Sequence, residues 1–213
     1  QDSVFGEIYR GKVFWFWDDT GRLSYPLGHF WMAGAVSSLP GQGGLDPAAG
    51  VNLRYFTDKE GFSRPMARLG VEKGPIWADG FLTLADPSGR ERLVCHYAHM
   101  ESLAKTLDHG LAVYNDEKEE FERLKALDMD DLWRFPAQAH PFRHREGDVE
   151  YLYFGQVFPT VRVKADWKSY LDPASYEGFA RVDGGARCEW RRDARPESGE
   201  AEQKRIAAGK MNA

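Results

Sequence analysis

The residues of this sequence that are best suited to chemistry are acids that follow runs of large aromatic side chains. Asp18 and Asp19 directly follow the run VFWFW, and Asp79 follows Trp77 in the segment GPIWADG. Two carboxyl groups that flank a glycosidic bond can hydrolyse it, one as base or nucleophile and the other as proton donor. The distance between them decides whether the sugar retains or inverts its configuration. We therefore take Asp19 and Asp79 as candidate catalytic residues.

Strand geometry separates the two neighbouring acids, because successive side chains of a strand point to opposite faces. Asp19 then shares a face with Trp17, and Asp18 shares the other face with Phe16. A second interpretation stays open, since the segments DDTG and ADG are also typical of turns. In that interpretation the acids shape the backbone and do no chemistry.

Aromatic and basic side chains elsewhere in the sequence are candidates for binding a sugar. The flat faces of Tyr25 and Trp77 suit stacking on a pyranose ring, although most large aromatic residues pack inside a protein. Arg22 and His140 can donate hydrogen bonds to hydroxyl or carboxylate groups, with a plain surface position as the alternative. The partner that we expect is therefore a saccharide.

No set of side chains has the spacing of a metal or cofactor site. His96 and His99 lie three residues apart, which places them on opposite faces of a strand, and no third ligand is convincingly placed. The Gly-rich segment PGQGG lacks the helix and the Lys-Ser/Thr pair of a phosphate loop. We predict no metal and no cofactor.

Composition and charge argue against several classes of protein. The chain has 213 residues, of which 42% are hydrophobic, and a net charge of −5. A mildly acidic surface disfavours nucleic acid as a partner, and no apolar run approaches the ~18 residues of a membrane span. Cys95 and Cys188 are either two free thiols or one disulfide, so they do not fix the compartment. The chain begins at Gln1 without a leader, and we expect a secreted or periplasmic location if a signal peptide has been removed.

Strand patterns dominate the sequence, and they come in a repeated form. The aromatic runs KVFWFWDD, ERLVCHYAHM and DVEYLYFGQV each follow a Gly-containing turn. Each is followed by a second run of small and β-branched residues, namely AGAVSSL, HGLAVYND and PTVRVKAD. Such repetition predicts an all-β fold of radially arranged sheets, as in a β-propeller, with a sandwich of hairpins as the alternative. Short helices are predicted over residues 100–110 and 169–180, the second with Asp172 as its N-cap and Pro173 in its first turn.

Four stretches carry a resemblance to known proteins: VFWFWDDTGRLSYPLGHF, GPIWADGFLT, HGLAVYNDEKEEFERL and HPFRHREGDVEYLYF. Together they resemble a group of uncharacterised bacterial proteins that look like five-bladed β-propeller glycosidases of the arabinanase and β-xylosidase type. In that resemblance Asp19 matches the acid of a recurring WGDT element, and Asp18 stands where glycine is usual. The resemblance implies five blades, of which this sequence supplies about three, with the others beyond Ala213. We expect a partial β-propeller domain over residues 1–190 and a polar tail or helix over residues 191–213.

The resemblance implies a glycoside hydrolase-like protein that acts on saccharides through carboxyl groups. The characterised propeller glycosidases use a Glu on a later blade as general acid, and Glu150, beside a turn, is an available candidate. Two further functions stay open, and with them the question of whether the chain is an enzyme. One is a non-catalytic carbohydrate-binding or scaffold propeller, and the other is an inactive fragment that self-associates through exposed blade edges.

Overall fold

The computed structural model describes residues 2–18, 32–46, 48–102, 104–137, 139–155, 158–182, 187–192, 194–195, 203–204 and 206–209. Strands make up 53% of the structure and helices 12%, which confirms the all-β prediction. The chain divides into two compact units, unit 1 (Gln1–Met129) and unit 2 (Asp130–Ala213). The sequence indicated no boundary there, and the expected domain limit at residue 190 stays a prediction.

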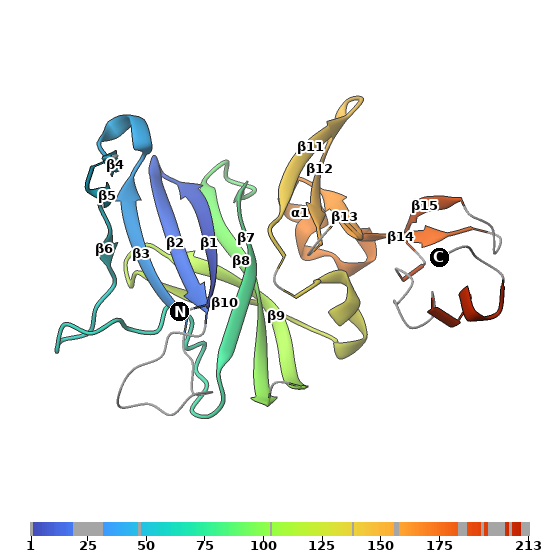
Figure 1. Ribbon diagram of the computed structural model, residues 1–213, viewed down its shortest axis with the longest axis horizontal. Coiled ribbons are helices and arrows are strands. Elements are labelled where there is room, and N and C mark those ends of the chain that lie inside the picture. The colour runs from blue at the N-terminus through green and yellow to red at the C-terminus, as the bar shows by residue number, and fades with distance from the viewer. Residues whose placement is uncertain are drawn as a thin grey trace. The chain divides into compact units, whose positions relative to one another are not determined.

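Unit 1 contains two antiparallel sheets of four strands each, and both appear in Figure 1. The first sheet has the order β1 (Asp2–Tyr9), β2 (Lys12–Asp18), β3 (Ala33–Ser38), β6 (Arg54–Tyr55). The second has the order β10 (Glu120–Leu127), β9 (Lys105–Asn115), β8 (Glu91–Ser102), β7 (Ile76–Ala85). A 3-10 turn η1 (Pro40–Gln42) and a small hairpin of β4 (Leu45–Asp46) and β5 (Gly50–Val51) lie between β3 and β6 in the chain.

Aromatic side chains on alternate positions of β2 build the core of unit 1. Phe14 and Phe16 both lie in this core, on one face of β2 as the alternation in the sequence predicts, and Phe16 is 0% exposed. The Phe16 ring stacks on Phe81 of β7 with centroids 4.3 Å apart and meets Phe121 of β10 edge-on at 5.4 Å. The core therefore joins the two sheets; its other members include Phe5, Tyr9, Val36, Phe56, Met66, Ile76, Leu93, Cys95, Tyr97 and Tyr114.

The first strands of the two sheets are neighbours. Phe5 of β1 contacts Phe81 of β7 at 5.4 Å between ring centroids, and Thr83 donates a hydrogen bond of 3.1 Å to Glu7. From the first contact to the second, the residue number increases on both strands, so β1 and β7 run in the same direction. Unit 1 therefore has one end that carries Asp79 and the Asp2–Asp18 pair of the first sheet, and an opposite end at the Tyr9–Lys12 turn.

The helix predicted over residues 100–110 is wrong, because β8 and β9 continue through this segment. Met100 pairs with Thr106, and Ser102 pairs with Lys105. Register shifts on both sides of Met100 break the simple alternation, so the sequence resembles a helical period. Gly110, the last residue of the predicted range, instead permits a close approach of two strands.

Replacing Gly110 with alanine is expected to destabilise unit 1 by about 1–3 kcal/mol, as overpacking does in other cores. An added Cβ would lie 2.3 Å from the carbonyl oxygen of Lys125 and 2.8 Å from the Tyr97 hydroxyl. Urea denaturation measures the loss. Gly41→Ala is the matched control, because no heavy atom lies within 4 Å of its Cβ position. Equal stability of both variants would contradict the close approach.

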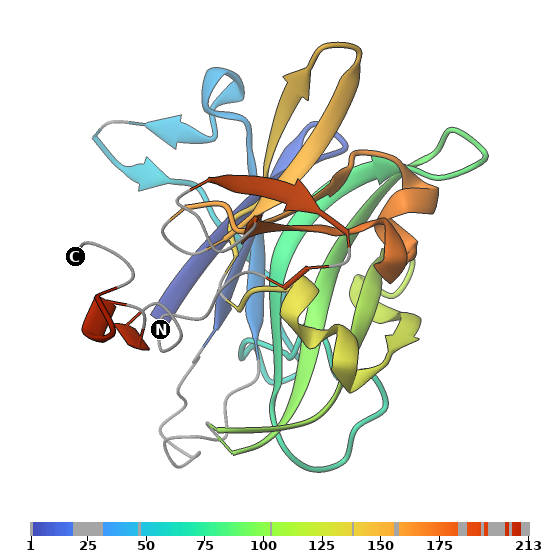
Figure 2. The ribbon, with the colours of Figure 1, turned by 90° about the vertical axis from the view of Figure 1, so that its right-hand side faces the viewer.

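Unit 2 contains one antiparallel sheet of five strands, in the order in which the chain forms them. The strands are β11 (Phe142–Glu146), β12 (Val149–Phe154), β13 (Val161–Lys164), β14 (Glu177–Arg181) and β15 (Cys188–Arg191). In both Figure 1 and Figure 2, β11 and β12 form a long hairpin. The 3-10 segment η2 (Met129–Arg134) begins at the boundary of the units, and residues 203, 204, 206 and 207 of the expected tail are helical.

The second predicted helix is confirmed at its cap and wrong in its extent. The structure has a short helix α1 (Trp167–Leu171) and a 3-10 turn η3 (Pro173–Ser175). Asp172 caps η3 by accepting a hydrogen bond from the Ala174 amide at 3.1 Å, and Pro173 occupies its first turn. The segment after η3 enters strand β14 instead of continuing the helix, since it pairs with β13.

Candidate functional site

The structure describes three of the six predicted site residues. Asp19, Arg22 and Tyr25 lie outside the described residues. Trp77 and Asp79 both lie on β7 in unit 1, on the same face of the strand. His140 lies in unit 2, in an exposed position just before β11.

The Asp79 carboxyl group is held at the start of a chain of hydrogen bonds, which we name the Asp79 relay. The pairing of β7 with β8 sets Asp79 opposite His96, and Asp79 Oδ1 lies 3.4 Å from His96 Nδ1. His96 Nε2 lies 3.0 Å from His109 Nδ1, and His109 Nε2 lies 2.6 Å from the carbonyl oxygen of Asp128. The Asp79 side chain is 15% exposed, while His96 and His109 are buried. An ordinary turn acid is solvated, so this carboxyl group is held in an unusual setting.

Sequence patterns do not reveal the two histidines of the relay. In the sequence His96 stands out only together with His99, as a possible pair of metal ligands, and strand alternation predicts that the two lie on opposite faces. The structure confirms this separation, because His99 bonds instead to Asp108 at 2.9 Å. The signal that could have found the relay is register, since a hairpin at Asp86–Gly89 sets Asp79 opposite His96. Among the described residues, no group of three or more His, Cys, Asp and Glu side chains could hold a metal ion.

A second carboxyl group lies at the same end of unit 1. Burial raises the pKa of the Cys95 thiol, and the negative charges of Asp79 and Asp18 raise it further. The buried Cys95 thiol is therefore influenced by the negative charge of one acid from each sheet. The described acid on the first sheet is Asp18, the residue just before the predicted Asp19. Cys95 and Cys188 are both free thiols.

Trp77 lies beside Asp79 and keeps one polar group buried. Its indole Nε1 is shielded from solvent, and in the described parts of the chain no atom accepts a hydrogen bond from it. Since Trp77 and Asp79 share a face of β7, their side chains lie on the same side of the second sheet.

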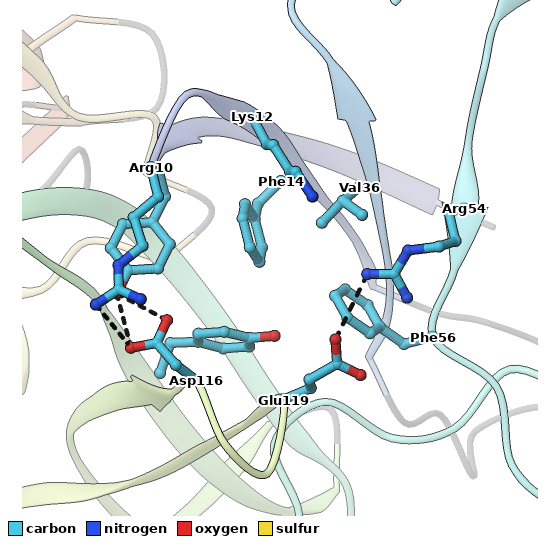
Figure 3. A pocket seen from close by; sticks show the side chains of 10 residues that line it. Arg10, Lys12, Phe14, Val36, Arg54, Phe56, Asp116 and Glu119 are labelled. Carbon is cyan, nitrogen blue, oxygen red and sulfur yellow. Dashed lines mark hydrogen bonds and ion pairs between the residues drawn. The ribbon is translucent and has the colours of Figure 1, made fainter.

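The opposite end of unit 1 carries a pocket of about 220 Å³, which we name the aromatic pocket. In Figure 3 the Arg10–Asp116 pair and the Arg54–Glu119 pair lie on opposite sides of the pocket. The two ion pairs measure 3.2 Å and 3.5 Å. The remaining lining residues are Tyr9, Lys12, Phe14, Val36, Phe56 and Tyr114.

The polar groups of the aromatic pocket include the phenols of Tyr9 and Tyr114 and the amine of Lys12. Burial, a hydrogen bond of 3.0 Å to Asp116 and the charge of Asp116 raise the pKa of Tyr9. Burial and the charge of Glu119 raise the pKa of Tyr114. Both phenols therefore stay protonated at neutral pH. Within the described ranges the Lys12 amine has no hydrogen bond or ion pair to another side chain.

Comparison with known proteins gives no match to a family model, to a curated protein or to a solved structure. In the described part of the chain, no helix has the length and apolar character to cross a membrane.

Proposed function

We propose that this chain belongs to a saccharide-acting hydrolase of the propeller glycosidase type, with Asp79 as one of its catalytic carboxyl groups. The observation that carries the proposal is the Asp79 relay. Two buried imidazoles fix a nearly buried carboxyl group at one end of the sheets. Fixing a carboxyl group in this way lowers the cost of orienting it toward a reacting bond.

The second carboxyl group of the proposed pair is that of Asp19, which follows Asp18, the last residue of β2, in the sequence. The negative charges of Asp18 and Asp79, which come from different sheets, both raise the pKa of the Cys95 thiol. Asp19 directly follows Asp18 in the chain. Glycoside hydrolysis needs such a pair, within about 10 Å of each other. Asp19 remains the proposed partner of Asp79. Asp18 is the described residue next to it in the chain.

The propeller arrangement is also a proposal, and three features support it. Each large sheet follows the order of the chain, as a blade does. The first strands of the two sheets of unit 1 run side by side, as the inner strands of adjacent blades would. The two sheets share one core, as adjacent blades would.

Hydrolysis of a panel of nitrophenyl arabinosides, xylosides and galactosides tests the enzyme proposal. We expect turnover of at least one glycoside, and Asp79→Asn should lower kcat/KM at least about 100-fold, which is the lower range for loss of a proton-transfer group. Asp46→Asn is the matched control, because Asp46 caps an exposed turn between β4 and β5. Absence of turnover by the wild type, or full activity of a folded Asp79→Asn variant, would overturn the proposal.

A second candidate is a non-catalytic saccharide-binding protein, and the aromatic pocket favours it. The rings of Phe14 and Tyr114, with centroids 5.3 Å apart, line the pocket together with the paired charges, a setting that suits one sugar ring with its hydroxyl groups. Calorimetric titration with monosaccharides checks this candidate. Lys12→Met should weaken binding about 2- to 10-fold, the effect of one hydrogen bond, while Lys59→Met outside the pocket should not. Equal affinity of the two variants would contradict binding at this pocket.

A further inference from the structure

The amine of Lys12 is a hydrogen-bond donor of the aromatic pocket that has no acceptor. Lys12 begins β2, and alternation along the strand places it on the same face as Phe14, another lining residue. In the view of Figure 3 its amine points toward the middle of the pocket. Among the residues that the structure describes, it forms neither a hydrogen bond nor an ion pair. An ammonium group can only donate hydrogen bonds, so it can bind an acceptor that a ligand supplies.

The hydroxyl group of Tyr114 is a second donor without an acceptor. Tyr114 is 3% exposed, and its ring meets those of Tyr9 and Phe14 edge-on, with centroids 6.2 Å and 5.3 Å apart. Burial raises the pKa of this phenol, so it keeps its proton at neutral pH. The Tyr9 hydroxyl donates to Asp116 at 3.0 Å, whereas that of Tyr114 has no hydrogen bond in the described part of the chain. A buried side chain with an unpaired hydroxyl favours a ligand that offers an acceptor.

The two carboxylates of the pocket are already neutralised by arginines. Each lies within ion-pair distance of two guanidinium groups: Asp116 of Arg10 (3.2 Å) and Arg90 (2.7 Å), and Glu119 of Arg54 (3.5 Å) and Arg64 (3.8 Å). The acids of the pocket therefore do not take up the charge of Lys12.

The acids next to the pocket also leave the charge of Lys12 in excess. Glu91 accepts a hydrogen bond of 3.0 Å from the backbone amide of Arg10, and Glu120 lies 3.9 Å from Arg64. The four arginines and Lys12 are five cations, and the carboxylates that contact them are four. A ligand with one negative charge would balance this set.

The walls of the pocket limit the size of such a ligand and favour an apolar surface on it. Four buried rings line the pocket, those of Tyr9, Phe14, Phe56 and Tyr114. Its volume of about 220 Å³ is below the range of about 300–1,000 Å³ that is usual for drug-sized ligands. The space therefore suits a single ring, whose faces or edges can pack on the aromatic side chains.

We propose that the aromatic pocket binds a small acid with one carboxylate on a single six-membered ring, held by the Lys12 amine and the Tyr114 hydroxyl. A carboxylate only accepts hydrogen bonds, so it satisfies both donors, and its bond to an ammonium group is about twice as strong as a neutral one. The proposal deepens the second candidate function, on which it rests for the use of this pocket. A sugar acid and an aromatic acid share the chemistry that it requires.

Calorimetric titration of the full chain with two acids and their amides tests the proposal. The pairs are benzoate with benzamide and glucuronate with glucuronamide, and within each pair the ring is the same and only the charged group changes. At least one acid should bind about 10- to 100-fold more tightly than its amide, the effect of a hydrogen bond to a charged group. The acid that binds identifies the kind of ring. Equal affinity within both pairs, or binding of neither acid, would overturn the proposal.

Inorganic phosphate is the probe for the role of the ring, because it is an anion without one. It should bind at least about 10-fold more weakly than the preferred acid, since it buries no apolar surface on the aromatic walls. Phosphate binding as tight as that of the acid would overturn the proposed contact between the ring and the pocket.

Two variants test the two donors separately. Lys12→Met should lower the affinity for the acid to that for its amide. Tyr114→Phe should weaken acid binding about 10-fold and leave the urea midpoint unchanged, because the hydroxyl bonds to no described residue. Lys59→Met and Tyr55→Phe are the matched controls, since both residues lie outside the pocket, and they should keep the preference for the acid. A Lys12→Met variant that still prefers the acid would contradict the proposal.

The titrations also separate this proposal from the second candidate function. Binding of benzoate without binding of any monosaccharide would support the acid and reject the saccharide. Binding of glucose and glucuronamide as tight as that of glucuronate would support the saccharide and overturn the acid.

Discussion

Replacing Phe16 with alanine is expected to lower the free energy of unfolding by about 3–5 kcal/mol, the range for a buried aromatic residue. The Phe16 ring is fully buried and lies between rings of the opposite sheet, Phe81 and Phe121. Its removal leaves a cavity at the place where the two sheets of unit 1 meet. Because both sheets contribute to that core, the loss should weaken their association as well as the packing of β2.

Urea denaturation of wild type and Phe16→Ala measures this loss as a lower midpoint with an unchanged slope. Phe62→Ala is the matched control, because Phe62 in unit 1 is 54% exposed. Its effect should stay within about 0.5 kcal/mol, as for surface substitutions. Similar losses in the two variants would show that Phe16 does not lie in the shared core.

Replacing Arg162 with methionine is expected to destabilise unit 2 by about 3 kcal/mol, the lower range for breaking a buried ion pair. Arg162 is 9% exposed on β13, and it donates hydrogen bonds of 2.7 Å to Glu177 and 2.8 Å to Glu146. Its guanidinium also lies over the rings of Tyr151 at 4.3 Å and Trp190 at 4.8 Å. The variant loses these contacts and leaves Glu177 without its buried partner.

The contribution of Arg162 should depend on pH through Glu146. A hydrogen bond from Tyr153 lowers the pKa of Glu146 from its ordinary value of 4.5, partial burial opposes the shift, and Arg162 lowers it further. A depressed folded-state pKa stabilises the protein above the unfolded pKa, and this stability disappears as the pH falls through the folded pKa. The difference between wild type and Arg162→Met should therefore be constant above about pH 5 and shrink below the ordinary Glu pKa.

Unfolding of unit 2, followed by the fluorescence of Trp190 and its neighbours, measures both effects. Arg143→Met is the matched control, because Arg143 pairs with Glu150 on the same sheet with both side chains more than a third exposed. Such a surface pair should contribute at most about 1 kcal/mol. If Arg143→Met costs as much as Arg162→Met, the burial of Arg162 does not account for its effect.

The sequence predicted local features well, because they depend on neighbouring residues. The strands KVFWFWDD, ERLVCHYAHM and DVEYLYFGQV are confirmed as β2, β8 and β12. The common face of Phe14 and Phe16 follows from alternation alone, and the cap of Asp172 follows from its short polar side chain before proline. These features need no knowledge of which strands pair.

The features that the sequence did not predict depend on register between strands. Gly110 permits a contact with the carbonyl of Lys125, a residue on another strand. His96 meets Asp79 only because the hairpin and the irregularity after Asp79 fix their pairing. Cross-strand pairs and bulges are invisible in a single strand pattern, so the relay emerged only in three dimensions.

The meander order of the sheets has a consequence for synthesis on the ribosome. Because each strand pairs only with strands near it in the chain, no pairing has to join distant parts of the sequence, and the entropy that opposes closure is smaller than for distant pairings. The first sheet is complete in sequence at Tyr55, before the first residue of β7 has been added. A nascent chain can therefore assemble its sheets one after another, with the aromatic side chains of β2 exposed until β7 emerges to cover them.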